Sequence, residues 1–376
     1  MNISKRNTAL DITRITAMLS VISIHFFLNS GFYDNPILSR AMLFPVILRT
    51  ALTVCVPLFI MLSGYLLNRK TLSKKYYSGI SKTLGIYVLT ALSCMLYKNI
   101  RHGVPFTPRT IVFGILDFTG ANYSWYIEMY IGLFLMIPFL NLMYHGLETK
   151  KKKGILVLTL FALTTLPSLL NIYNFETPGW FHTPSLSESY QAIVPDWWIN
   201  SYPITYYMMG AYLKEYPVHL KKRYHLLLIA GAVLLFGLFN YYRCVGGYFC
   251  WGEYTAWYGI CTLILSFLFF SFLTIRNTST FPIWSKKFLA HISDLCLGAY
   301  LISYVWDDFF YGFLWKFVPE FSQKFHYFLP MVLIVAVFSL LSSWILNLIY
   351  RLIEYTIQKI FSKRTKKEKE LVTTAN

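Results

Sequence analysis

The chain has 376 residues, of which 56% are hydrophobic and only 14% are charged, and its mean hydropathy is +0.48. Soluble domains carry roughly 25% charged residues, so this composition excludes an ordinary soluble protein and indicates a polytopic membrane protein in a lipid bilayer. The net charge of +17 does not predict a nucleic-acid partner, because the basic residues occur in short runs between apolar segments, as in cytosolic loops.

Apolar segments recur along the whole chain at lengths that suit membrane crossing, which takes about 20 apolar residues. The run at 110–120 is too short to span alone and is expected to be re-entrant or interfacial. The sequence therefore predicts an all-α, polytopic helix bundle of about ten transmembrane helices. The predicted spans lie near residues 10–30, 43–67, 83–99, 124–145, 154–174, 200–213, 225–242, 254–275, 291–313 and 328–352.

The distribution of positive charge orients this bundle. With the N-terminus in the cytosol, about 25 of the 34 Lys and Arg residues fall on the cytosolic side. Both termini are therefore predicted to be cytosolic. We expect a single transmembrane domain over residues 1–360, followed by a basic cytosolic tail over 361–376 that is polar and disordered.

The first predicted span, residues 11–31, contains Arg14 and His25 among residues that otherwise suit lipid. Eleven residues are about three helical turns, so the two side chains share one face and lie roughly 16 Å apart along the axis. Ionisable residues inside a span are costly and normally face a protein interior or a watery cavity. Both positions are therefore candidate functional residues.

Arg14 lies one turn inside the cytosolic end of this span, with Asp11 three residues earlier as a possible ion-pair partner. One interpretation is an arginine that extends to the inner headgroups. The other is a guanidinium that lines a cytosolic vestibule and binds phosphates through its planar fork of donors. The residues alone leave both interpretations open.

His25 lies too far from the cytosolic end to reach it, although it could approach the outer interface. A neutral histidine that hydrogen-bonds across helices is one interpretation. The other is a general base, since the unperturbed imidazole pKa is about 6.5.

Several motifs, taken in order, resemble the membrane-bound acyltransferase-3 family. Arg14 and His25 with ten residues between them, preceded by Asp11, resemble its opening motif. The resemblance extends over nearly the whole chain, but many members have histidine where this chain has Tyr123 and Ser303. The later matching motifs are Ser63-Gly64-Tyr65, Trp125-Tyr126, Met209-Gly210-Ala211-Tyr212 and Leu297-Gly298-Ala299-Tyr300.

This resemblance implies transfer of an acyl group, commonly acetyl, from cytosolic acyl-CoA to a hydroxyl of a cell-surface polysaccharide or its lipid-linked precursor. It implies that Arg14 binds acyl-CoA and that His25 activates the acceptor hydroxyl at the cell membrane. Acyl-CoA, with acetyl-CoA favoured, is then a co-substrate, and no bound cofactor is expected.

Other positions are expected to support the site. Ser63 and Gly64 fall near the cytosolic end of the second span, where glycine permits close helix approach. Glu128 in the fourth span is expected to pair with Arg14 or His25, or to lie near the outer interface. The resemblance adds Tyr65 and Trp125 as supporting positions.

Some residues of the later spans fit no catalytic motif. Asp307 and Asp308 lie toward the outer end of the ninth span and are expected to be water-exposed. The six cysteines show no metal-binding spacing, so no metal site is predicted. Cys244 and Cys250 flank a loop predicted to lie outside, where a disulfide is an open possibility.

Two other function classes fit the same features. A transporter or flippase for a glycan precursor also needs a polytopic bundle with intramembrane Arg and His. A membrane sensor or scaffold would use the same residues only to hold helices together. Covalent transfer of a labelled acyl group would distinguish the enzyme from both.

Overall fold

The computed structural model describes residues 6–171, 173–174, 191–250 and 254–374, with side chains described as far as Ile360. Every regular element in this part of the chain is helical, which confirms the all-α prediction. The α-helices are α1 (Thr8–Asn29), α2 (Leu43–Leu52), α3 (Cys55–Leu67), α4 (Lys74–Ser78), α5 (Ser81–His102), α6 (Pro108–Leu116), α7 (Trp125–His145), α8 (Lys150–Thr164), α9 (Leu166–Leu170), α10 (Tyr202–Glu215), α11 (Lys222–Cys244), α12 (Ile260–Thr274), α13 (Ile283–Phe317), α14 (Phe321–Lys324) and α15 (Phe328–Thr374).

Within the described residues, 7 helical stretches are long and apolar enough to cross a membrane. Each of the ten predicted spans contains helix, but α8, α10 and α12 have only 14 or 15 residues. At 1.5 Å rise per residue, such helices are shorter than the roughly 30 Å apolar layer. The count of ten and the cytosolic position of the termini therefore stay predictions. The segment at 110–120 forms the short helix α6, with 9 residues.

The second predicted span is divided into α2 and α3 by a turn at Thr53. Pro57 lacks the N–H that would continue the helical ladder to the Thr53 carbonyl. Thr53 closes the end of α2 instead, since its N–H and its hydroxyl both donate to the Thr50 carbonyl, at 3.4 and 2.7 Å.

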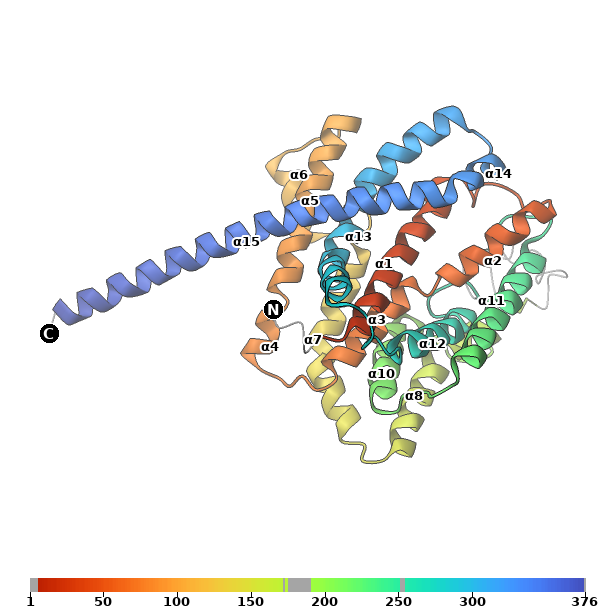
Figure 1. Cartoon of the computed structure of the whole chain (residues 1–376), viewed down its shortest axis with the longest axis horizontal. Helices are drawn as coiled ribbons and strands as arrows, with labels where there is room; N and C mark the ends of the chain where they lie inside the picture. The colour runs from red at the N-terminus through yellow and green to blue at the C-terminus, as the bar shows by residue number, and fades with distance from the viewer. Residues whose placement is uncertain (1–5, 172, 175–190, 251–253, 375–376) are drawn as a thin grey trace.

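Helix α1 lies in the middle of the bundle, where it packs against α2, α3, α12, α13 and α15 (Figure 1). Its start is fixed by Asn7, whose side chain accepts a hydrogen bond from the Ala9 N–H at 2.9 Å. Thr13 satisfies its own hydroxyl by donating to the Ala9 carbonyl. Because protein surrounds α1, its polar side chains face other helices, which lowers the cost of placing them in a span.

Helices α3 and α10 approach each other through two glycines. A Cβ atom at Gly64 would overlap the backbone carbonyl of Tyr207, and one at Gly210 would overlap the carbonyl of Met61. Only glycine permits backbones to come this close, as in other small-residue helix contacts. This close approach is the kind of contact expected of Gly64.

The last helix, α15, passes along the bundle and then projects away from the other helices toward the C-terminus (Figure 1). It continues through Thr374, past the start of the predicted disordered tail. Residues 361–376 contain no proline or glycine and are rich in Lys and Glu, which are good helix formers, so nothing in the sequence ends the helix at Ile360. The domain boundary at residue 360 stays a prediction.

Candidate active site

His25 on α1 pairs with an aspartate on the long helix α13. Its Nδ1 atom lies 3.2 Å from Oδ2 of Asp307, and the Tyr123 hydroxyl donates to the same oxygen at 2.9 Å. Both members of the pair are buried, with 7% of His25 and 1% of Asp307 exposed. The Asp307 carboxylate therefore lies beside Nδ1, and this pair does not engage Nε2, the other ring nitrogen.

The expectation that Asp307 is water-exposed is wrong. Asp307 lies one helical turn beyond Ser303 and two beyond Tyr300, so all three share the face of α13 that contacts α1 and Tyr123. Asp308 points elsewhere, toward His102 and Tyr97 at 2.9 and 2.7 Å. The helical spacing from the family-like Gly-Ala-Tyr motif points to Asp307, but it selects Asp307 over Asp308 only once the face of α13 that contacts α1 is known.

The two positions at which many family members have histidine both contact His25. The ring of Tyr123 packs on the imidazole with centroids 3.7 Å apart and planes 31° apart. The Ser303 hydroxyl lies 3.5 Å from His25 Nδ1. Tyr123 is held in turn by Tyr300, whose hydroxyl donates to its carbonyl. This chain therefore surrounds a single central histidine with hydroxyl-bearing side chains.

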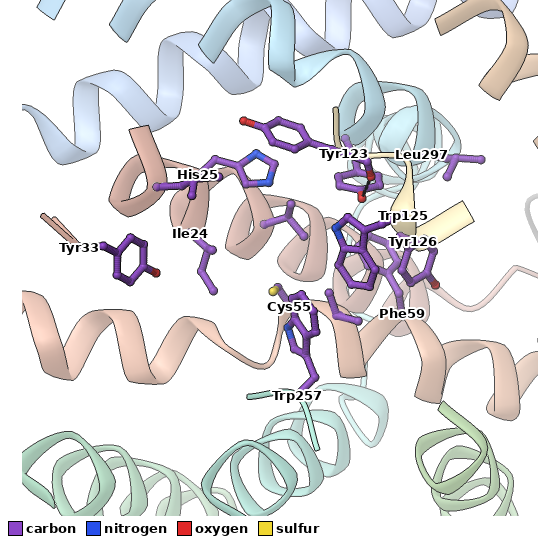
Figure 2. A pocket seen from close by; sticks show the side chains of 14 residues that line it. Ile24, His25, Tyr33, Cys55, Phe59, Tyr123, Trp125, Tyr126, Trp257 and Leu297 are labelled. Carbon is purple, nitrogen blue, oxygen red and sulfur yellow. Dashed lines mark hydrogen bonds between the residues drawn. The ribbon is translucent and has the colours of Figure 1, made fainter. Parts of the chain in front are cut away.

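His25 borders a small apolar cavity of about 150 Å³, which we call the outer cavity after the side on which the predicted topology places it. Trp125 and Trp257 stack at its wall, with ring centroids 4.4 Å apart (Figure 2). Of the described residues around it, none is Lys, Arg, Asp or Glu. The residues that line it are Val21, Ile24, His25, Leu28, Tyr33, Cys55, Val56, Phe59, Tyr123, Trp125, Tyr126, Trp257, Leu297 and Tyr300.

Arg14 belongs to a polar network at the other end of α1. Its Nη1 donates to the Ser293 hydroxyl at 2.6 Å and lies 3.8 Å from the Asp11 carboxylate, the partner that the sequence suggested. The closer partner of Asp11 is Arg6, with contacts of 2.6 and 2.8 Å, and Arg6 also binds Asp294. Asp11 is thus a link in a network that also contains Arg6, Ser293 and Asp294, which the sequence did not predict.

Arg14 borders a second, more polar hollow of about 390 Å³, which we call the inner hollow. The residues that line it include Ser63, Tyr130 and Lys82, whose side chains carry two hydroxyl groups and an ammonium group. The Arg14 side chain is 27% exposed, so its charge remains accessible from the hollow. This arrangement agrees with the vestibule interpretation of Arg14.

Phe59, Tyr126 and Leu297 line both the outer cavity and the inner hollow. The two spaces are therefore neighbours that share one wall. Arg14 borders the inner hollow and His25 borders the outer cavity, as expected for two residues on one face of the first span.

The other predicted positions divide into those near the site and those away from it. Trp125 lines the outer cavity and Ser63 the inner hollow, where the Ser63 hydroxyl donates to the Phe59 carbonyl at 3.1 Å. Tyr65 packs against Phe270 instead, with ring centroids 6.0 Å apart. The Glu128 side chain is exposed and borders neither space, so the expected pairing with Arg14 or His25 is not formed.

Cys244 and Cys250 lie close together but are not joined in a disulfide. The Cys250 backbone N–H donates to the Cys244 sulfur at 3.3 Å. In the described part of the chain, no group of three or more His, Cys, Asp and Glu side chains is arranged to hold a metal ion.

The geometry combines an oriented imidazole in an apolar space with a cation in a polar space on the other side of a shared wall. A histidine oriented by a carboxylate is the arrangement that proton transfer to or from a reacting hydroxyl requires. A guanidinium facing a hollow suits an anionic ligand such as a phosphate.

Comparison with known proteins agrees with this geometry. No match was found among curated proteins or among solved structures. A family model described as an acyltransferase domain matches residues 7–348, nearly the whole chain and every residue of both spaces. This chain therefore belongs to the acyltransferase-3 family.

Proposed function

We propose that this protein is an integral membrane O-acyltransferase of the cell membrane. It moves an acyl group, acetyl in the first instance, from cytosolic acyl-CoA to a hydroxyl of a cell-surface polysaccharide or its lipid-linked precursor. The observation that carries the proposal is the buried His25–Asp307 pair beside an apolar cavity that adjoins the Arg14 hollow. Family membership supports the acyl-transfer reaction class.

In the proposed reaction, Nε2 of His25 takes the proton from the acceptor hydroxyl as its oxygen attacks the thioester carbonyl carbon. The new C–O bond forms, the C–S bond breaks, and the imidazolium returns the proton to the departing thiolate. Asp307 stabilises the transient imidazolium and holds the ring in place. The reaction is proton-neutral, and it yields the acyl ester and free CoA thiol.

The donor is placed by charge. Acyl-CoA carries several phosphate charges, and Arg14 supplies a planar set of donors that matches a phosphate group. The two residues lie about 16 Å apart along α1, so an extended pantetheine arm passes from the inner hollow to His25. The wall shared by the two spaces is the proposed route of that arm.

Purified protein in lipid nanodiscs, incubated with acetyl-CoA labelled in the acetyl group, tests this proposal. The acceptor is cell-surface polysaccharide prepared from cells that lack this protein. We expect label to become covalently attached to the glycan, with an increase of about 42 mass units per modified residue. Absence of label on the glycan and on its lipid-linked precursor would refute the assignment.

The same preparation distinguishes the transporter alternative. Proteoliposomes loaded with a glycan precursor should show no export of unmodified precursor. Vectorial movement without covalent transfer would indicate a flippase, since both function classes accommodate intramembrane ionisable residues.

A further inference from the structure

Three side chains from three helices form the wall between the outer cavity and the inner hollow: Phe59 on α3, Tyr126 on α7 and Leu297 on α13. The rings of Phe59 and Tyr126 are in contact, with centroids 5.9 Å apart. In Figure 2 these three side chains gather at one end of the outer cavity, and Tyr33 lies at the opposite end beyond His25. We call them the passage residues.

The outer cavity differs chemically from the inner hollow. Its lining is almost entirely carbon, and His25 and Tyr123 are among the few lining residues whose side chains carry a polar atom. The inner hollow includes Arg14, Lys82 and Asp294. A group that moves from the inner hollow to the outer cavity therefore leaves a charged environment for an apolar one.

Building on the proposed function, we infer that the passage residues and the outer cavity select the acyl group of the donor. They admit short, uncharged acyl groups and exclude those that carry a carboxylate. The observation behind this inference is the juxtaposition of a charged donor hollow and a charge-free cavity across one apolar wall.

The size of the cavity sets the length limit. An apolar cavity of about 150 Å³ holds a ligand the size of benzene, which has six carbons. The outer cavity has about this volume. Acetyl to hexanoyl groups therefore fit within this volume beside His25, and longer chains exceed it.

The charge limit is tested by a matched pair of donors, butyryl-CoA and succinyl-CoA, because both acyl groups have four carbons and only succinyl ends in a carboxylate. Burying an unpaired carboxylate in an apolar space is strongly unfavourable. We expect kcat/KM for butyryl-CoA to exceed that for succinyl-CoA by at least about 100-fold. Equal use of the two donors would overturn the inference.

The length limit is tested at Leu297 with acetyl-, hexanoyl- and decanoyl-CoA. Leu297→Ala widens the passage and should raise the kcat/KM ratio of decanoyl to acetyl by about tenfold. Leu297→Phe narrows the passage and should lower the kcat/KM ratio of hexanoyl-CoA to acetyl-CoA by a similar factor. Leu341→Ala on α15, where the side chain is exposed, is the matched control and should leave both ratios unchanged.

These experiments separate failure of the inference from failure of the proposed function. If no donor transfers its acyl group to the glycan, the proposed function is wrong. If acetyl is transferred but neither Leu297 variant changes the donor ratios while both remain folded, the acyl-selection inference alone is overturned. Ratios that move in opposite directions in the two variants would support it.

Discussion

The outer cavity and the inner hollow lie along the same helix, α1, yet they hold their ionisable residues in different ways. His25 and Asp307 are almost completely buried and paired at a fixed distance. Arg14 is partly exposed, and Asp294 in the same network has 44% of its side chain exposed. Buried polar pairs have one geometry and interact strongly, whereas exposed charges are screened and adaptable. Changes in the outer cavity should therefore affect the chemical step, and changes in the inner hollow should affect donor binding.

The largest expected effect is that of His25→Ala. Without the imidazole, the proposed reaction loses the group that takes the proton of the acceptor hydroxyl, so kcat for acyl transfer should fall by about 10²–10⁴-fold. Acyl transfer to glycan measured in nanodiscs checks this result. His326→Ala, at a histidine that does not line the outer cavity, is the control. Near-normal transfer by a folded His25→Ala protein would contradict a catalytic role.

The second-largest effect is expected for Asp307→Asn, with Asp308→Asn at the adjacent residue as its control. Asp307→Asn keeps the side-chain volume but replaces the carboxylate beside His25, so kcat should fall by an amount that approaches the loss in His25→Ala, with little change in the donor KM. Asp308→Asn is matched in chemistry and lies one residue away, and its carboxylate contacts His102 instead. It should leave kcat unchanged. Equal losses in the two variants would show that Asp307 has no special relation to His25.

Asp307 also shows what the sequence could not supply. Arg14 and His25 were found from the sequence because an ionisable residue in an apolar span is conspicuous and their spacing places them on one face. Asp308 is an equally polar neighbour of Asp307. To decide which of the two aspartates contacts His25, one must know how α13 is rotated about its axis relative to α1. That rotation depends on packing between helices distant in the chain, which no local pattern encodes.

The spans were predicted with similar limits. Apolar runs located the predicted spans, each of which contains helix, because apolar length is a local property. The break at Thr53 follows from Pro57, but the short lengths of α8, α10 and α12 depend on neighbouring helices. Glu128 shows the same limit, since a carboxylate inside a predicted span faces outward rather than toward the site.

Arg14→Ala should have a smaller effect than either substitution in the outer cavity. Loss of a charged hydrogen bond to phosphate should raise KM for acetyl-CoA by about 10- to 100-fold with kcat nearly unchanged. A truncated donor without phosphates, S-acetylpantetheine, supplies the control, because the variant and the original protein should use it equally. A similar loss with both donors would indicate that Arg14 supports the fold rather than the donor.

The smallest expected effect concerns α3, which forms part of the wall of both spaces and is held against α10 at Gly64. Gly64→Ala places a methyl group against the Tyr207 carbonyl, and relieving that overlap moves the backbones apart. We expect a loss of about 1–3 kcal/mol in stability and only a several-fold loss of activity. Gly231→Ala on α11 is the matched control, because a Cβ there meets nothing within 4 Å. The melting temperature in detergent checks the comparison.

The kinetics of Gly64→Ala show which space this contact supports. If kcat falls and KM is unchanged, the contact mainly supports the outer cavity. If KM rises and kcat is unchanged, the contact mainly supports the inner hollow. Equal melting temperatures for the two variants would mean that the α3–α10 contact is not needed to hold the shared wall.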